Sequence, residues 1–124
     1  MRTASRAPSP GPAAARIKGC CQALAPCAAP AVVDRVATML RALADPTRLQ
    51  MLHMLARAHD PVCVCDFTAA FQLGQPTVSH HLAKLRDAGL VTSNRQGIWA
   101  FYALAPDLPA VVRTVVDELA AAAA

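Results

Sequence analysis

Aromatic and charged side chains are both scarce in this 124-residue chain, at 4% and 16% of the residues. Alanine is abundant instead, and this composition favours helices that pack closely on small side chains over a large β-sheet core. A chain of this length has room for one domain with a modest hydrophobic core.

The sequence also lacks the features of a membrane protein, a secreted protein and an enzyme. No apolar run approaches the roughly 20 residues of a membrane-spanning helix, and the first residues lack the hydrophobic core of a signal peptide. We therefore expect a cytoplasmic protein whose five cysteines are kept as thiols. A glycine-rich phosphate loop and paired carboxylates are missing too, which argues against an enzyme.

The net charge of +4 is placed unevenly along the chain. Residues 1–18 carry four cations and no acid, whereas residues 19–124 carry eight of each. Residues 1–16 are rich in proline, alanine, serine and arginine, a composition typical of a flexible segment. We expect a flexible, cysteine-bearing extension over residues 1–30 and one folded domain over residues 31–124.

The most informative stretch is residues 75–91, which reads as one helix with both ends marked. Pro76 suits a first helical turn, and Gly89 suits a left-handed C-terminal cap. Val78, Leu82 and Leu85 follow helical spacing and form an inward stripe.

The outer faces of this helix carry polar and charged side chains in the order that a DNA-reading helix needs. Short hydrogen-bonding side chains come first and cations follow, an order that would place small groups on base edges and charges on phosphates. An ordinary solvated surface helix can carry the same residues, so both interpretations stand at this point. The expected DNA contacts on this helix are Gln75, Thr77, Ser79, His80 and Lys84.

The segments around this helix support a DNA-binding fold. We expect helices near residues 31–43, 45–58 and 66–73, with Asp45 as the N-cap of the second. After the reading helix, residues 90–94 and 98–104 are β-prone and are joined through residues 95–97, which predicts a hairpin with Arg95 at its tip, in or over the minor groove. A last helix should begin at residue 106 and end at residue 119. This order is that of a winged helix-turn-helix, a mainly α fold with a β-hairpin wing.

The segments ALADPTRLQMLHML, VCVCDF, QPTVSHHLAKLRDAGLV and RQGIWAFYAL resemble the ArsR/SmtB family of metal-responsive repressors. The resemblance covers residues 33–119. It implies a homodimeric winged helix-turn-helix repressor that binds double-stranded operator DNA. The last helix has more apolar surface than one small domain covers, and in this family the first and last helices of two subunits pack together. The expected interface residues are Val33, Val36, Leu40, Val112, Val115, Val116 and Leu119.

The five cysteines form two close pairs and one single residue. Cys63 and Cys65 are one residue apart, Cys20 and Cys21 are adjacent, and Cys27 lies alone. Free cysteine packs well in a core, but reduced thiols at such spacing also suit a soft ion that prefers sulfur. The segment VCVCDF resembles the thiolate metal box of the family, although Pro61-Val62 stands where the box usually begins Glu-Leu.

The preferred inducer is As(III) or Sb(III), which takes three thiolates. We expect these from Cys20, Cys21 and either Cys63 or Cys65. Cd(II) and Pb(II) sensors in the family also join such a pair to N-terminal cysteines, so these ions remain the alternative. Residues 107–124 contain no histidine, so the zinc site that some members carry on the last helix is absent. A thiol redox switch on the same DNA-binding fold, or a thiol-rich metal buffer, would use the same cysteines.

Overall fold

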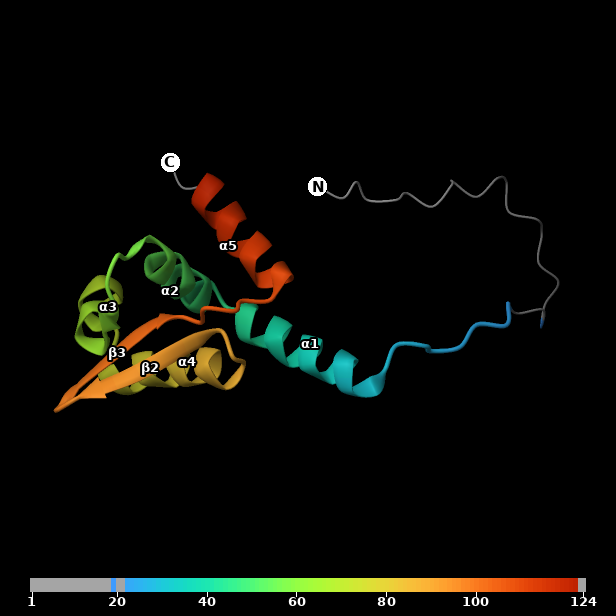
Figure 1. Cartoon of the computed structure of the whole chain (residues 1–124), viewed down its shortest axis with the longest axis horizontal. Coiled ribbons are helices and arrows are strands. Elements are labelled where there is room, and N and C mark those ends of the chain that lie inside the picture. The colour runs from blue at the N-terminus through green and yellow to red at the C-terminus, as the bar shows by residue number, and fades with distance from the viewer. Residues whose placement is uncertain (1–18, 20–21, 123–124) are drawn as a thin grey trace.

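The computed structural model describes residue 19 and residues 22–122, in which five helices and three strands form (Figure 1). In chain order the elements are α1 (Pro30–Leu43), α2 (Pro46–Arg57), β1 (Val62–Cys63), α3 (Val64–Phe71), α4 (Gln75–Asp87), β2 (Val91–Gln96), β3 (Trp99–Leu104) and α5 (Ala110–Ala122). The expected mainly α architecture with a β-hairpin is confirmed. None of the helices in this described part has the length and apolar character needed to cross a bilayer.

The core forms around α4. Val78, Leu82 and Leu85 of this helix are fully buried, as the helical stripe predicts. They belong to one cluster with fully buried residues of α2, α3, α5 and the segment after α4, namely Met51, Leu52, Phe67, Leu90 and Val112. Burial of one such side chain stabilises a fold by roughly 1.5–3 kcal/mol. The outer face of α4 is therefore presented by a helix that is fixed on its inner side.

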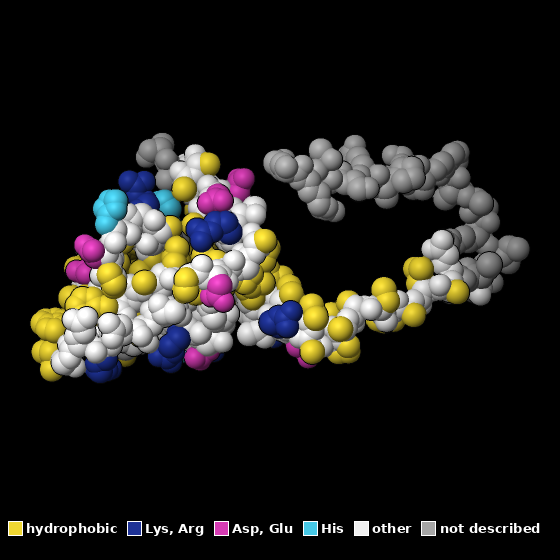
Figure 2. Space-filling model, in the orientation of Figure 1, with side chains coloured by type: hydrophobic (Ala, Val, Ile, Leu, Met, Phe, Trp, Pro, Cys, Tyr) yellow, Lys and Arg dark blue, Asp and Glu magenta, His cyan; other side chains and the backbone are white. Residues whose placement is uncertain are grey.

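Helix α1 is covered only at its C-terminal end. Met39, Ala42 and Leu43 are buried, while the rest of the helix runs outward from the body of the domain (Figure 1). Hydrophobic side chains lie along this projecting part (Figure 2). Between 38% and 49% of the surface of each of these side chains is exposed, and they are Val32, Val33, Val36 and Leu40. A single chain thus leaves an apolar helix face in water.

The strands form one antiparallel sheet in the order β1–β3–β2. Strands β2 and β3 make the expected hairpin, with the register running from Val91 opposite Leu104 to Gln96 opposite Trp99. The third strand, β1, pairs Val62 with Tyr102 and was not predicted, because two residues are too short to show an alternating pattern.

Two helices begin and end at other residues than expected. Helix α3 begins at Val64 rather than near residue 66 and ends at Phe71, where the following Gln72 has a left-handed φ of 55°. Helix α5 begins at Ala110 rather than at residue 106, since the first helical hydrogen bond after the Pro106-Asp107 turn goes from the Arg113 amide to the Pro109 carbonyl, and it continues to Ala122.

A polar network around Arg48 joins α1, α2 and α4. The Arg48 guanidinium donates to the Ala42 carbonyl over 2.7 Å and to the Arg41 carbonyl over 3.4 Å at the end of α1. Its Nη1 also lies 3.1 Å from His81 Nδ1 on α4. An arginine only donates, so Nδ1 is the acceptor in this contact, and His81 faces inward as expected.

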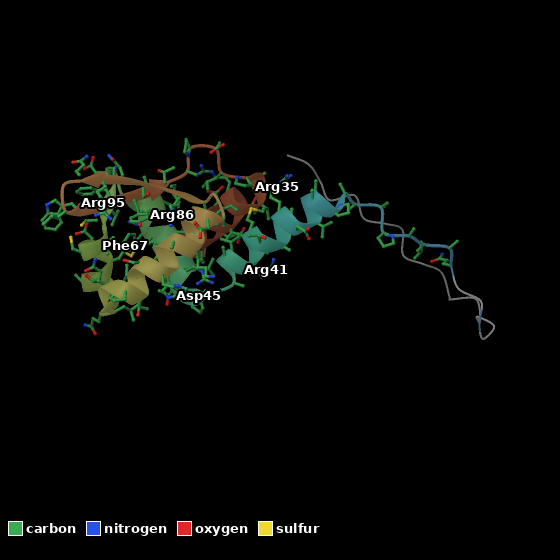
Figure 3. All side chains as sticks on the ribbon, turned by 90° about the horizontal axis from the view of Figure 1, so that it is seen from below. Arg35, Arg41, Asp45, Phe67, Arg86 and Arg95 are labelled. Carbon is green, nitrogen blue, oxygen red and sulfur yellow. The ribbon has the colours of Figure 1, made fainter. Side chains whose placement is uncertain are left out.

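Asp45 caps α2 within this network, as the sequence predicts. Its Oδ1 accepts the Arg48 amide over 3.0 Å, and it lies where α1 ends, close to α4 (Figure 3). This backbone hydrogen bond, followed by the charge of Arg48, lowers the pKa of the Asp45 carboxyl below its ordinary value, against the opposing effect of partial burial.

We expect Asp45→Ala to lower the free energy of unfolding by about 1 kcal/mol at pH 7, because the first turn of α2 loses its acceptor. Asp45→Asn keeps the acceptor and loses only the charge. A folded-state pKa below the unfolded one means that the carboxylate stabilises the fold above its ordinary pKa, and that this stability is lost as the pH falls through the folded value. The advantage of the parent over Asp45→Asn should therefore shrink between pH 7 and pH 3 in urea unfolding at fixed protein concentration. A constant difference across that range would contradict the role of the charge.

Candidate functional site

The polar face of α4 carries the residues that the sequence assigned to DNA contact. Gln75, Thr77, His80 and Lys84 are exposed, and Ser79 is half-buried. Gly74 stands at the N-cap and offers no side-chain acceptor, and Pro76 occupies the first turn. The free amides and the positive end of the helix dipole therefore point out of the N-terminal turn. Lys84 and Arg86 in the last turn supply cations.

The β2–β3 hairpin, which we call the wing (residues 91–104), lies beside α4. The sequence predicted Arg95 at the tip of the wing, and this prediction is wrong. Arg95 lies within β2, opposite Ala100. The tip is the two-residue turn Gly97-Ile98. Gly97 has a φ of +63°, which is the left-handed conformation that a tight hairpin turn needs and that glycine adopts easily.

An open groove of about 450 Å³ lies between the start of α3, the polar face of α4 and the wing. Its lining includes Cys63, Cys65, Gln75, Ser79, Arg86, Arg95, Ile98 and Trp99. Arg86 and Arg95 lie on the same side of the molecule (Figure 3), and the residues that line this groove include no acid. We call it the α4–wing groove. Thiols, hydrogen-bonding side chains and cations thus border one cavity.

The two thiols of this groove differ in their surroundings. Cys63 is 6% exposed and is the N-cap of α3: its Sγ accepts the Cys65 amide over 3.4 Å, while its own amide donates to Asp66 Oδ2 over 3.0 Å. This is a capping box in which sulfur takes the usual place of a hydroxyl oxygen. Cys65 lies in the first turn of α3 and is exposed.

The side-chain hydrogen bond with Cys63 raises the pKa of the Cys65 thiol above its ordinary value of 9.0. Partial desolvation and the negative charge of Asp66 act in the same direction. At neutral pH the thiol is therefore protonated, and an ion that binds its sulfur must displace a proton.

The structure brings only part of the predicted metal site together. Cys63 and Cys65 border the same groove, Cys27 is exposed in the extended segment before α1, and Cys20 and Cys21 lie outside the described residues. Within residue 19 and residues 22–122, no three histidine, cysteine or acidic side chains are grouped closely enough to hold a metal ion.

The predicted interface residues divide into two groups. Val33, Val36 and Leu40 of α1 are exposed, whereas Val112 and Val116 of α5 are buried in the core of their own chain. Val115 and Leu119 are half-buried. Part of the apolar face of α5 is thus covered within one chain.

Several residues of the groove were not singled out from the sequence. Arg86 follows Gln75, Ser79 and Ala83 on one helix face, so helical spacing carried a signal for it. Ile98 and Trp99 were assigned only to a β-prone run, and their place in the groove depends on the turn that precedes them.

These elements define a class of protein. Two helices joined by a short turn, α3 and α4, are followed by a protruding hairpin that forms a three-stranded sheet with β1, which is a winged helix-turn-helix. Comparison with solved structures agrees. The homodimeric winged helix-turn-helix DNA-binding domain Mb0332 of Mycobacterium bovis, a possible ArsR-family regulator, matches with a TM-score of 0.64 and 30% identity over 80% of this chain and 90% of that one.

Sequence comparison narrows the class to one family. The family described as "Bacterial regulatory protein, arsR family" matches residues 45–93. The arsenical resistance operon repressor of Escherichia coli is 40% identical over 80 residues, which are 64% of this chain and 68% of that protein. The arsenic resistance transcriptional regulator ArsR1 of Pseudomonas putida is 42% identical over 83 residues, or 64% of each chain. The chain belongs to the ArsR family of helix-turn-helix regulators, and it spans just under two thirds of the length of the Pseudomonas relative.

We predict that Cys65 reacts slowly with iodoacetamide at pH 7.5 in a variant whose Cys20, Cys21 and Cys27 are serine, because the raised pKa keeps its thiol protonated. The rate should still be rising with pH at pH 9. Cys63→Ala should accelerate the reaction by removing the hydrogen bond and the neighbouring thiol, and Cys63→Ser, which retains a hydrogen-bonding side chain, serves as the matched control. Mass spectrometry gives the rate at Cys65, and a rate at pH 7.5 equal to that of a free cysteine peptide would contradict the raised pKa.

Proposed function

We propose that this protein is a metalloid-responsive transcriptional repressor that binds operator DNA as a homodimer and is released when As(III) or Sb(III) binds cysteine thiolates. The observation that carries the proposal is the α4–wing groove. Cys63 and Cys65 border the same cavity as Gln75 and Ser79 of α4 and Arg95 of the wing. An ion held by those sulfurs lies next to the DNA-contacting surface and changes it directly.

In the DNA complex, α4 lies in the major groove. Its exposed N-terminal residues Gln75, Thr77 and His80, with the half-buried Ser79, reach base edges, and Lys84 binds phosphate. Arg95 binds the DNA backbone from the wing. Arg86 is an added phosphate contact, since it borders the groove and its exposed pairing with Asp87 over 3.7 Å is weak.

A homodimer explains the uncovered face of α1. Val33, Val36 and Leu40 are exposed on a helix that projects from the domain, and a second copy supplies a matching face. Two chains also present two α4 helices, whose separation would match one DNA turn of roughly 34 Å. Val115 and Leu119 of α5 extend the interface, while Val112 and Val116 support it from within each core. The related Mb0332 domain is described as homodimeric.

The inducer site combines a thiol of the groove with thiols of the N-terminal extension. Cys65 is the better third ligand for Cys20 and Cys21, because it is exposed while the Cys63 sulfur is engaged as the α3 cap. Helix α1 runs away from the domain, and α3 and the wing lie at the opposite end (Figure 1). This arrangement supports a site shared between subunits, in which the extension of one chain reaches the groove of its partner.

Arsenical resistance repressors among the relatives support a metalloid inducer. Cd(II) or Pb(II) remains the second candidate, since these ions also bind such thiolate sets. The raised pKa of Cys65 disfavours a peroxide-sensing thiol, which needs thiolate character at neutral pH. A cytoplasmic location, in which cysteines stay reduced, is part of this proposal.

The dimer proposal predicts that Leu40→Glu yields monomers, because a charge replaces an exposed apolar side chain at the interface. Thr38→Glu, on the opposite side of the same helix, is the matched control and should stay dimeric. Sedimentation equilibrium measures the mass, and circular dichroism should show both variants folded. A dimeric Leu40→Glu variant would move the interface away from α1.

The function is tested by titrating the protein on the DNA upstream of its own gene, with As(III), Sb(III), Cd(II), Pb(II) and Zn(II) added separately. The parent should bind specifically and lose about a hundredfold in affinity with As(III), which corresponds to about 3 kcal/mol of coupling. Cys65→Ser and the Cys20→Ser/Cys21→Ser double variant should bind equally well and stay bound, whereas Cys27→Ser should respond like the parent. His80→Ala should weaken specific binding by about 1–3 kcal/mol without abolishing the response.

The outcomes separate the candidates. Absence of sequence-specific binding by the parent would exclude a repressor and favour a metal buffer. Release by Cd(II) or Pb(II) but not by As(III) would select the second inducer class, and release by peroxide alone would select a redox switch. Release of the double variant at the parental As(III) concentration would leave the Cys63–Cys65 pair as the whole site.

A further inference from the structure

The tip of the wing presents an apolar side chain to solvent. Ile98 is 84% exposed and Trp99 is 50% exposed, so the end of the hairpin is hydrophobic on its outside. Hydrophobic side chains gather at the edge of the molecule where the hairpin ends, next to Lys or Arg side chains (Figures 1 and 2).

The turn itself does not require this residue. Gly97 has a positive φ and Ile98 does not, so glycine fills the first central position of a two-residue turn. This matches a type II′ turn, whose second central position accepts ordinary residues. A polar side chain would fit at position 98 without disturbing the fold. The reason for an isoleucine here therefore lies in what its side chain contacts.

We propose that Ile98 enters the minor groove of the operator as an apolar wedge, with Trp99 packed behind it against the sugar-phosphate backbone. This inference rests on the proposed function, since it takes for granted that α4 binds DNA. It assigns to Ile98 the place at the wing tip that the sequence alone suggested for Arg95.

Charge around the tip selects DNA as the occupant rather than a protein. Ile98 and Trp99 line the α4–wing groove together with Arg86 and Arg95, and no acid lines it. A positive, hydrogen-bonding cavity that continues into an apolar tip complements a phosphate-edged minor groove.

The dimensions of the hairpin also suit the minor groove. Each strand has six residues, so the wing extends about 20 Å, and its tip is a turn of only two residues. The minor groove is roughly 6 Å wide, which excludes a helix but admits a single aliphatic side chain at a hairpin turn. Aliphatic residues in this position partly unstack a base step and bend the duplex.

An uncharged wedge has a signature that a phosphate contact lacks. Removing Ile98 weakens binding without changing the number of counterions released, so the slope of log affinity against log salt stays constant. Removing Arg95 reduces that slope by about one for each subunit.

The test uses the full-length parent and the variants Ile98→Ser, Ile98→Leu and Arg95→Ala on the DNA upstream of the gene, at salt concentrations between about 50 and 200 mM. Ile98→Ser should weaken binding about tenfold for each subunit with an unchanged salt slope, as expected for loss of one buried aliphatic side chain per wing, and Ile98→Leu should restore the affinity. Energy transfer between dyes at the two DNA ends should show less bending with Ile98→Ser than with the parent. Trp99 is the only tryptophan of the chain, so its emission should shift to shorter wavelength when DNA is added.

The wedge is refuted if the parent binds specifically while Ile98→Ser binds with the same affinity and the same Trp99 emission shift. It is equally refuted if Ile98→Ser changes self-association in sedimentation but leaves DNA affinity intact, because the tip would then contact protein. Failure of the parent itself to prefer this DNA would refute the proposed function instead. Circular dichroism of Ile98→Ser confirms that the exposed substitution leaves the fold unchanged.

Discussion

The placement of α4 depends on one guanidinium. Among the side-chain hydrogen bonds of the described residues, those of Arg48 alone reach both the end of α1 and the inner side of α4, through the Ala42 carbonyl and His81 Nδ1. Its own amide is held by Asp45, so the cap of α2 and the orientation of Arg48 are set together. A lysine at this position has one charged nitrogen and no planar fork, so it cannot donate to the Ala42 carbonyl and to His81 Nδ1 at the same time. The angle between the projecting helix α1 and the polar face of α4 is thus fixed by hydrogen bonds as well as by apolar packing.

The thiol pair is joined to the wing through the backbone. Cys63 belongs to β1 and pairs with Phe101 of β3, so the strand that carries the first sulfur is part of the same sheet as the hairpin. The same residue caps α3, which packs against α4. A displacement of Cys63 therefore acts directly on α3 and on the wing, which both flank the α4–wing groove. The thiol pair and this groove are thus connected without a long path through the protein.

Sequence reasoning succeeded where one residue type has one local role. Pro76 and Gly89 bracket α4, Asp45 caps α2, and the stripe of Val78, Leu82 and Leu85 is buried. It failed where the outcome depends on tertiary context. Sulfur is not among the usual helix caps, so the role of Cys63 left no pattern. The apolar face of α5 was visible, but periodicity does not tell whether a face is covered by its own chain or by another, and Val112 and Val116 proved to be core residues.

The sulfur cap of α3 has a consequence for how such a chain can evolve. A helix N-cap accepts serine, threonine, aspartate or asparagine with little change in stability, and the second half of the box, the Asp66 carboxylate on the Cys63 amide, uses only backbone at position 63. A single nucleotide change from cysteine to serine at this position would remove a thiol from the α4–wing groove while the helix start, the sheet pairing and the surface of α4 persist. The thiol content of the α4–wing groove can therefore change in descendants of this chain without passing through unfolded intermediates, on a fold that itself stays the same.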